Sequence, residues 1–222
     1  MLIRRTLAGC LLAAPALLCG AEFVRMSIRV DSDSYAAKLA AIDADRGLWE
    51  VFGWLTLMLM LTWLGATLGL VEALRASQPI AAWVGGVIGV TGAVAFAMHQ
   101  GQYVEINAVL ARDAGFRDTA ERVGITGTGM EDATVVLQLL GIWIGPVVLT
   151  AAMARAGLLS WWRFACVPVW VVLFVFVGSM SPVFAFIHLI LLPPFFEVSL
   201  QLTRSDATVD EPEPAGLRPQ EL

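Results

Sequence analysis

The sequence predicts an all-α fold, a bundle of transmembrane helices with six spans. Three observations support this prediction. Of the 222 residues, 58% are hydrophobic and only 15% are charged, whereas a soluble domain carries roughly 25% charged residues. The mean hydropathy is +0.76. Apolar runs follow one another from residue 7 almost to residue 203, so no separate soluble domain fits between them.

The first four spans follow from intervals that lack charged residues. A helix needs roughly 20 apolar residues to cross about 30 Å of hydrocarbon. Such intervals predict spans at about residues 6–22, 51–72, 79–99 and 133–154. The alternative for the first segment is a cleaved signal peptide, because Arg4 and Arg5 precede a short apolar run and Cys19 and Ala21 fit a cleavage site.

The last two spans are predicted from one long apolar interval. Between Arg163 and Glu197 lie 33 uncharged residues. One helix of that length would measure about 50 Å, which exceeds an ordinary crossing. Gly178 and the Ser181-Pro182 step oppose helix continuation. We therefore predict two spans, at about residues 164–180 and 182–203, with five spans and one long bent helix as the alternative.

The positions of the arginines predict the orientation. In a six-span arrangement the arginines of the short loops fall on one side, which should be cytoplasmic. These residues are Arg4, Arg5, Arg75, Arg155, Arg163 and Arg204. The N-terminus and the C-terminus are then cytoplasmic in a bacterial plasma (inner) membrane. Residues 205–222 are acidic and contain proline, which predicts a disordered tail.

Two loops on the opposite side contain further helical patterns. Ser34 can cap a helix, and Tyr35, Leu39 and Ile42 recur at helical spacing. This pattern predicts a short amphipathic helix at residues 34–46 that lies on the membrane surface. Residues 103–116 are expected to form a second one.

Small residues at a spacing of four predict close helix packing. The GxxxG pairs occur in three predicted spans and allow backbones to approach closely. We interpret them as packing sites within one chain, with dimerisation as the alternative. The pairs are Gly65 and Gly69, Gly85 and Gly89, and Gly141 and Gly145. Gln138 and the threonines inside the spans are expected to form hydrogen bonds between helices.

His99 and His188 are the only histidines in the chain. Both are predicted near the outer side of the bundle, so two imidazoles from different helices could bind haem b. With Glu22, Gln100 or Glu105 they could instead hold a divalent metal. The simpler interpretation is a hydrogen bond to a neighbouring helix. Glu72 and Glu197 lie near cytoplasmic helix ends, where they reach water or take part in proton transfer.

The sequence contains no recognisable catalytic motif. The glycine-rich segment at residues 124–129 lacks the Gly-Lys-Ser/Thr of a phosphate loop, and no His-Glu-x-x-His helix occurs. Cys10, Cys19 and Cys166 fall inside predicted spans and form no disulfide framework. Nucleic acid is excluded as a partner because no basic stripe is present.

The first half of the chain has a characteristic set of residues: Arg5 with Gly9 in the first helix, Glu22-Phe23 and Arg25 at its end, Asp31 and Asp33, the alanine-rich residues 36–44 and Leu48-Trp49. In these residues it resembles a bacterial family of six-span membrane proteins of unknown function, common in actinobacteria. The resemblance implies an architecture and no activity.

The leading functional hypothesis is a non-enzymatic accessory protein without a cofactor. Its partners would be the lipid bilayer and other membrane proteins or a second copy. One alternative is a redox or metal-binding subunit that uses His99 and His188. A small transporter is the other, although the sequence shows no pair of helices broken at the bilayer midplane around a charged site.

Overall fold

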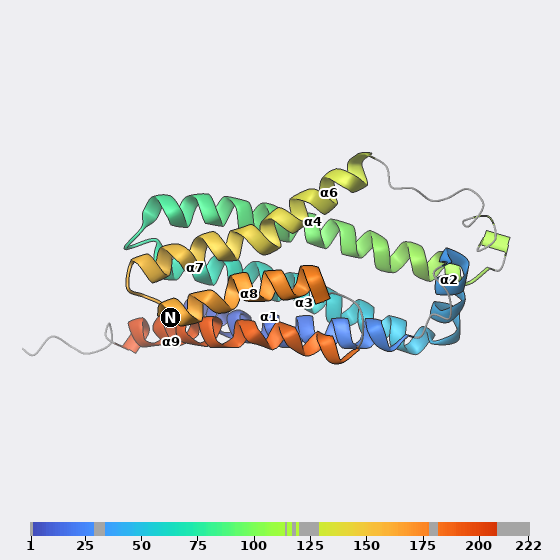
Figure 1. Ribbon diagram of the computed structural model, residues 1–222, viewed down its shortest axis with the longest axis horizontal. Helices are drawn as coiled ribbons and strands as arrows, with labels where there is room; N and C mark the ends of the chain where they lie inside the picture. Colours follow the sequence, from blue (N-terminus) through green and yellow to red (C-terminus); the bar gives the residue numbers. More distant parts are fainter. Residues whose placement is uncertain are drawn as a thin grey trace, which may run out of the picture.

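The computed structural model describes residues 2–28, 34–113, 115–116, 119, 129–177 and 182–207. Every regular element in this part of the chain is helical, which confirms the predicted all-α class. The long helices lie side by side along one axis (Figure 1). In chain order they are α1 (Leu2–Ser27), α2 (Tyr35–Ala44), α3 (Arg46–Leu74), α4 (Pro79–Ala111), α6 (Gly129–Leu139), the π-helical turn η1 (Leu140–Ile144), α7 (Gly145–Arg155), α8 (Trp161–Val177), the 3₁₀ helix η2 (Pro182–Leu191) and α9 (Leu192–Ala207).

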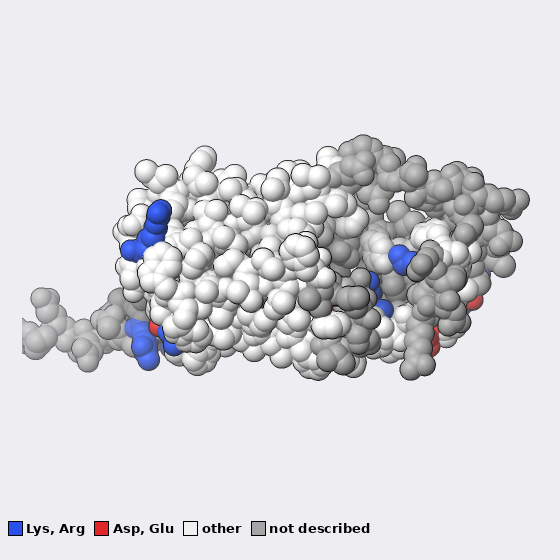
Figure 2. Space-filling model, viewed as in Figure 1, with Lys and Arg blue, Asp and Glu red and all other residues white. Residues whose placement is uncertain are grey.

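The surface of the bundle is suited to lipid. Trp54, Trp83 and Phe176 are all at least 66% exposed. Charged side chains visible in Figure 2 gather at the two ends of the molecule and leave a band without charged residues between them on this face. Such a band is stable in hydrocarbon, where helices satisfy their own backbone groups. The chain is therefore a multi-pass membrane protein.

Five helical segments are long and apolar enough to cross a membrane. They are Leu2–Ser27, Arg46–Leu74, Pro79–Ala111, Ala133–Arg155 and Phe184–Arg204. The sixth predicted span corresponds to α8, which has 17 residues and stands at the lower limit of a crossing. Six crossings stay a prediction.

The contacts between α8 and the η2–α9 segment show that the two segments run antiparallel. Arg163 forms an ion pair with Glu197, and Trp170 donates a hydrogen bond of 2.8 Å to His188. In one continuous helix, residues 170 and 188 would stand about 27 Å apart. The long apolar interval therefore folds back on itself and does not form one bent helix. The predicted break at residues 178–181 lies outside the described residues.

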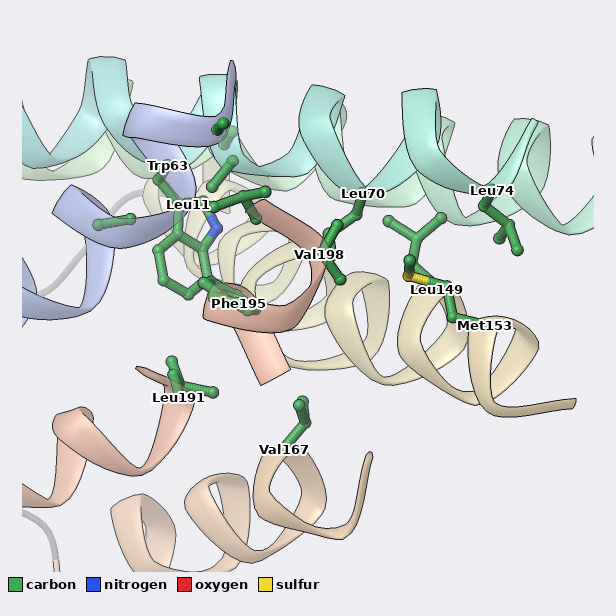
Figure 3. Close-up of a cluster of buried hydrophobic side chains, with 14 of the residues drawn as sticks. Leu11, Trp63, Leu70, Leu74, Leu149, Met153, Val167, Leu191, Phe195 and Val198 are labelled. Atoms are coloured by element: carbon green, nitrogen blue, oxygen red, sulfur yellow. The ribbon is translucent and has the colours of Figure 1, made fainter. Parts of the chain in front are cut away.

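The core is built by side chains that converge from α1, α3, α7, α8, η2 and α9. Leu11, Trp63, Leu149, Val167 and Phe195 are at most 2% exposed and belong to one buried cluster, in which Leu11, Trp63 and Phe195 lie together (Figure 3). Lipid tails are as apolar as these side chains, so dispersion contacts and shape complementarity hold the helices together.

Close helix contacts occur at all six glycines of the GxxxG pairs. A Cβ atom on Gly65 would meet Cys10 of α1, and one on Gly145 would lie 2.8 Å from the Cα atom of Gly89. The remaining four face Leu11, Leu149, Thr67 and Gly92, all in this same chain. Sequence reasoning missed Gly92, whose backbone lies directly against that of Gly141.

Two predicted surface helices differ from the structure. Ser34 caps α2 through the amide of Ala37, as expected, but Leu39 and Ile42 are buried against protein and do not face lipid. Residues 103–111 form no separate helix, because α4 continues to Ala111. The tail predicted to be disordered from residue 205 begins as helix, because α9 continues to Ala207. Residues 208–222 lie outside the described part of the chain.

Replacing Gly92 with alanine should destabilise the bundle, whereas the same change at Gly101 in the same helix should not. A Cβ on Gly92 would overlap the backbone of Gly141, while nothing lies within 4 Å of one on Gly101. We expect Gly92→Ala to cost about 1–3 kcal/mol and Gly101→Ala to leave stability unchanged or raise it by up to about 1 kcal/mol. Thermal unfolding in detergent measures both. Equal melting temperatures would contradict the close contact.

Candidate functional site

A cavity lies inside the bundle where five helical segments meet. Its volume is about 80 Å³, and residues of α1, α3, α4, α6–η1 and α8 line it. A water molecule needs roughly 10–15 Å³ measured in this way. The cavity therefore has room for several waters or one small molecule.

The cavity wall contains polar side chains that have no hydrogen-bond partner among the described residues. These include the Thr56 hydroxyl, the Trp63 indole N–H and the Gln138 carbonyl oxygen, all of which are buried. Each such group costs about 1–3 kcal/mol when it stays unpaired. The prediction that Gln138 bonds to another helix is wrong, since its carbonyl has no partner there.

The threonines show a second departure from that prediction. Thr67 donates to the carbonyl of Trp63, and Thr150 donates to that of Pro146. Both bonds stay within one helix, so these hydroxyls do not join helices. Thr56 differs from them because its hydroxyl has no such carbonyl partner.

Glu22 adds a carboxylate to the cavity wall. Arg25, one turn further along α1, donates from Nε and Nη2 to Glu22 Oε2, at 3.0 and 2.7 Å. The other oxygen, Oε1, has no partner among the described residues and remains an acceptor. Gln100 of α4 lines the cavity as well.

Two of the membrane segments are interrupted helices. Pro146 has no N–H to bond to the carbonyl of Ile142, and the chain widens into the π turn η1 just before it. The last segment begins as ten residues of 3₁₀ helix, η2, and becomes α-helical near Pro193 and Pro194.

The π turn lies at the cavity. Ile142 and Trp143 of η1 line it together with Gln138 of the preceding turn. Single π turns within α-helices occur frequently at functional sites, because they redirect side chains. Here the turn places an indole ring and an amide on the same wall.

A larger groove runs along α3 and α4 next to the cavity. Its volume is about 610 Å³. Thr56 and Gln100 border both spaces, so the cavity and the groove adjoin at these two side chains. Glu50, Glu105 and Arg112, all exposed, line the groove.

The structure gives the two histidines different surroundings. His99 lies on α4, half-buried, and stacks on Tyr103 with a centroid distance of 6.4 Å. His188 lies on η2, is 1% exposed and contacts Trp170 and Phe174 of α8. Helix α4 packs on α2, α3 and the α6–α7 segment, whereas η2 packs on α1, α8 and α9. Neither histidine lines the cavity.

The hydrogen bond of His188 leaves no lone pair for a metal. Its Nδ1 accepts from Trp170, so the neutral ring carries its proton on Nε2. Within the described residues, no three His, Cys, Asp or Glu side chains gather into a metal-binding group. Haem or metal binding by His99 and His188 thus gains no support from these contacts and stays a hypothesis.

The two carboxylates considered for proton transfer are paired. Glu72 binds Arg4 and Arg75, and Glu197 binds Arg163. Glu72 lies near the end of α3, and its ion pair with Arg4 joins it to the start of α1. Ion pairs of this kind suit an anchor at the membrane surface better than a proton carrier.

Comparisons with protein-family models, with curated proteins and with solved structures found no match. Function is therefore argued from the site itself. Among the residues of the cavity, sequence reasoning had given Glu22, Gln100, Gln138 and the span threonines, which include Thr56, other roles, and it had missed Trp63. A polar side chain in the middle of an apolar span is the signal that points to Thr56.

Replacing Trp170 with phenylalanine should destabilise the protein by about 1–3 kcal/mol, because His188 Nδ1 then stays buried without a donor. Trp161, which is 59% exposed, provides the control, and Trp161→Phe should leave the melting temperature unchanged. Thermal unfolding in detergent compares them. If both variants melt like the wild type, the buried hydrogen bond contributes nothing to stability.

Proposed function

We propose that this chain is a non-enzymatic protein of a bacterial plasma membrane that binds a small polar molecule inside its helical bundle. The observation that carries the proposal is the cavity, with unpaired polar groups contributed by α3 and α6. A bundle that served only to pack would be more stable with apolar side chains at these positions. A bound molecule or water satisfies the groups instead.

The shape of the site supports a binding function. Ligand sites are concave and mostly apolar, with a few polar groups that fix the orientation of the ligand. Aromatic and aliphatic side chains form most of this wall, and Glu22, Thr56, Gln100 and Gln138 supply the polar groups. The accessory role expected from the sequence is compatible with such a site, since the bound molecule can report to a partner or to a second copy in the membrane.

A small transporter is the second candidate. Interrupted helices beside a binding site at mid-membrane are typical of transporters, and η1 provides one next to Gln138. Uptake of a solute by vesicles that contain the protein would distinguish transport from binding alone. The resemblance to a six-span bacterial family is retained as part of the proposal, as is the haem or metal alternative.

Thiol labelling tests whether small polar molecules reach the cavity. Thr56→Cys should react with iodoacetamide at least about tenfold faster than Thr150→Cys, because alkylation needs both the reagent and enough water to form a thiolate. Both threonines are at most 2% exposed, but only Thr56 lines the cavity. Site-resolved mass spectrometry gives the rates, and the native cysteines serve as internal references. Equal, slow labelling at both positions would overturn the proposal.

The proposed topology has its own test. With six crossings and cytoplasmic termini, a fluorescent protein that matures only in the cytoplasm should fluoresce when it is fused to either end of the chain. An alkaline phosphatase, active only outside the cytoplasm, should be inactive at both ends. Opposite results at the two ends would show an odd number of crossings, as five spans require.

A further inference from the structure

Aromatic rings dominate the wall of the central cavity. Ring centroids lie 6.1 Å apart for Trp63 and Trp170, 6.1 Å for Trp170 and Phe174, and 5.8 Å for Phe174 and Trp143. The four rings thus form a contiguous surface, and Phe52 and Phe96 complete the set. Rings of this kind attract cations through their negative faces, most strongly where water is excluded.

The charges at the cavity also favour a cation. Glu22 is the one charged residue in its described wall. Arg25 offsets that charge but occupies only Oε2, so Oε1 can accept a hydrogen bond from an N–H group. The carbonyl of Gln138 is a second free acceptor. An anion would meet no cationic side chain in this wall.

The neighbouring groove has a matching composition. Two carboxylates, of Glu50 and Glu105, face one cation, Arg112, along the groove. The indoles of Trp49 and Trp54 line it as well. An excess of negative charge raises the local concentration of cations at low ionic strength. Thr56 and Gln100 then separate the groove from the cavity.

We propose that the ligand is a small organic ammonium ion, which reaches the aromatic cavity through the groove between α3 and α4. The proposal rests on the binding function proposed above and names the ligand class of that same site. The ammonium group would contact the rings of Trp63, Trp143 and Phe174, with Glu22 Oε1 and the Gln138 carbonyl as its polar partners.

Protection of a cavity thiol tests the ligand class. The full-length Thr56→Cys protein is labelled with iodoacetamide in the presence of tetramethylammonium chloride, tert-butanol or sodium chloride. Tetramethylammonium should slow labelling at least about fivefold. Tert-butanol, a neutral molecule of similar size and shape, and sodium chloride at equal ionic strength should not. Equal protection by tert-butanol would overturn the ammonium class while the binding cavity stands.

Substitutions in the wall test the place of binding. Trp143→Leu in the Thr56→Cys protein should weaken protection by tetramethylammonium about tenfold, whereas Trp143→Phe, which keeps a ring, should preserve most of it. Glu22→Gln should weaken protection as well. Trp161→Leu, at an exposed position of α8, is the matched control and should change nothing. Protection that survives Trp143→Leu unchanged would place the ion elsewhere and overturn the proposal.

The two proposals fail in different ways. If Thr56→Cys is alkylated but no ammonium ion protects it, the ligand class is wrong and the accessible cavity remains. If Thr56→Cys is not alkylated at all, the binding function itself fails. Glu50→Gln combined with Glu105→Gln should slow the onset of protection by tetramethylammonium about threefold at low salt and leave it unchanged at high salt; no effect on this rate at low salt would exclude the groove as the route.

Discussion

The contact between the backbones of α4 and η1 is the constraint on which the rest of the structure depends. Because Gly92 and Gly141 have no side chains, the two segments touch directly, and Gly89 against Gly145 continues the contact into α7. In lipid, where burial of apolar surface drives no association between helices, such close approach supplies the dispersion energy that holds a bundle together. The π turn η1 lies at this contact and carries Ile142 and Trp143 into the cavity wall.

Unpaired polar groups in such an interior cost free energy, and the polar groups of this chain fall into a paired set and an unpaired set. At one end of the bundle, arginines neutralise Glu72 and Glu197. Deep in the bundle, Trp170 satisfies His188, and threonines such as Thr150 bond to their own helix. Around the cavity, Thr56, Trp63 and Gln138 have no partner in the described part of the chain, and the Ser160 hydroxyl, away from the cavity, also has none. Three such groups around one cavity indicate a site for a bound molecule or water.

The surroundings of His188 show why two histidines in a sequence do not by themselves identify a haem or metal site. Two histidines in apolar segments are compatible with haem or a metal. The fold instead sets His188 against Trp170 and Phe174 of α8, while His99 stacks on Tyr103 of its own helix. The aromatic residues that surround one histidine therefore also form part of the cavity wall, and they matter there as a surface for a cation.

Composition and the spacing of charges determined the fold class, the membrane character and the approximate spans, because lipid demands long apolar helices whatever their neighbours are. The glycine pairs likewise marked helix contacts. Length alone was not decisive: α4 has 33 residues in one helix, whereas the interval of 33 residues after Arg163 folds back, as its length together with glycine and a Ser-Pro step indicated. Only the tertiary structure decided the site, since Glu22, Thr56, Gln100 and Gln138 come from four helices and meet through packing. The partners that a polar side chain finds or lacks are a property of that packing, and no local pattern records them.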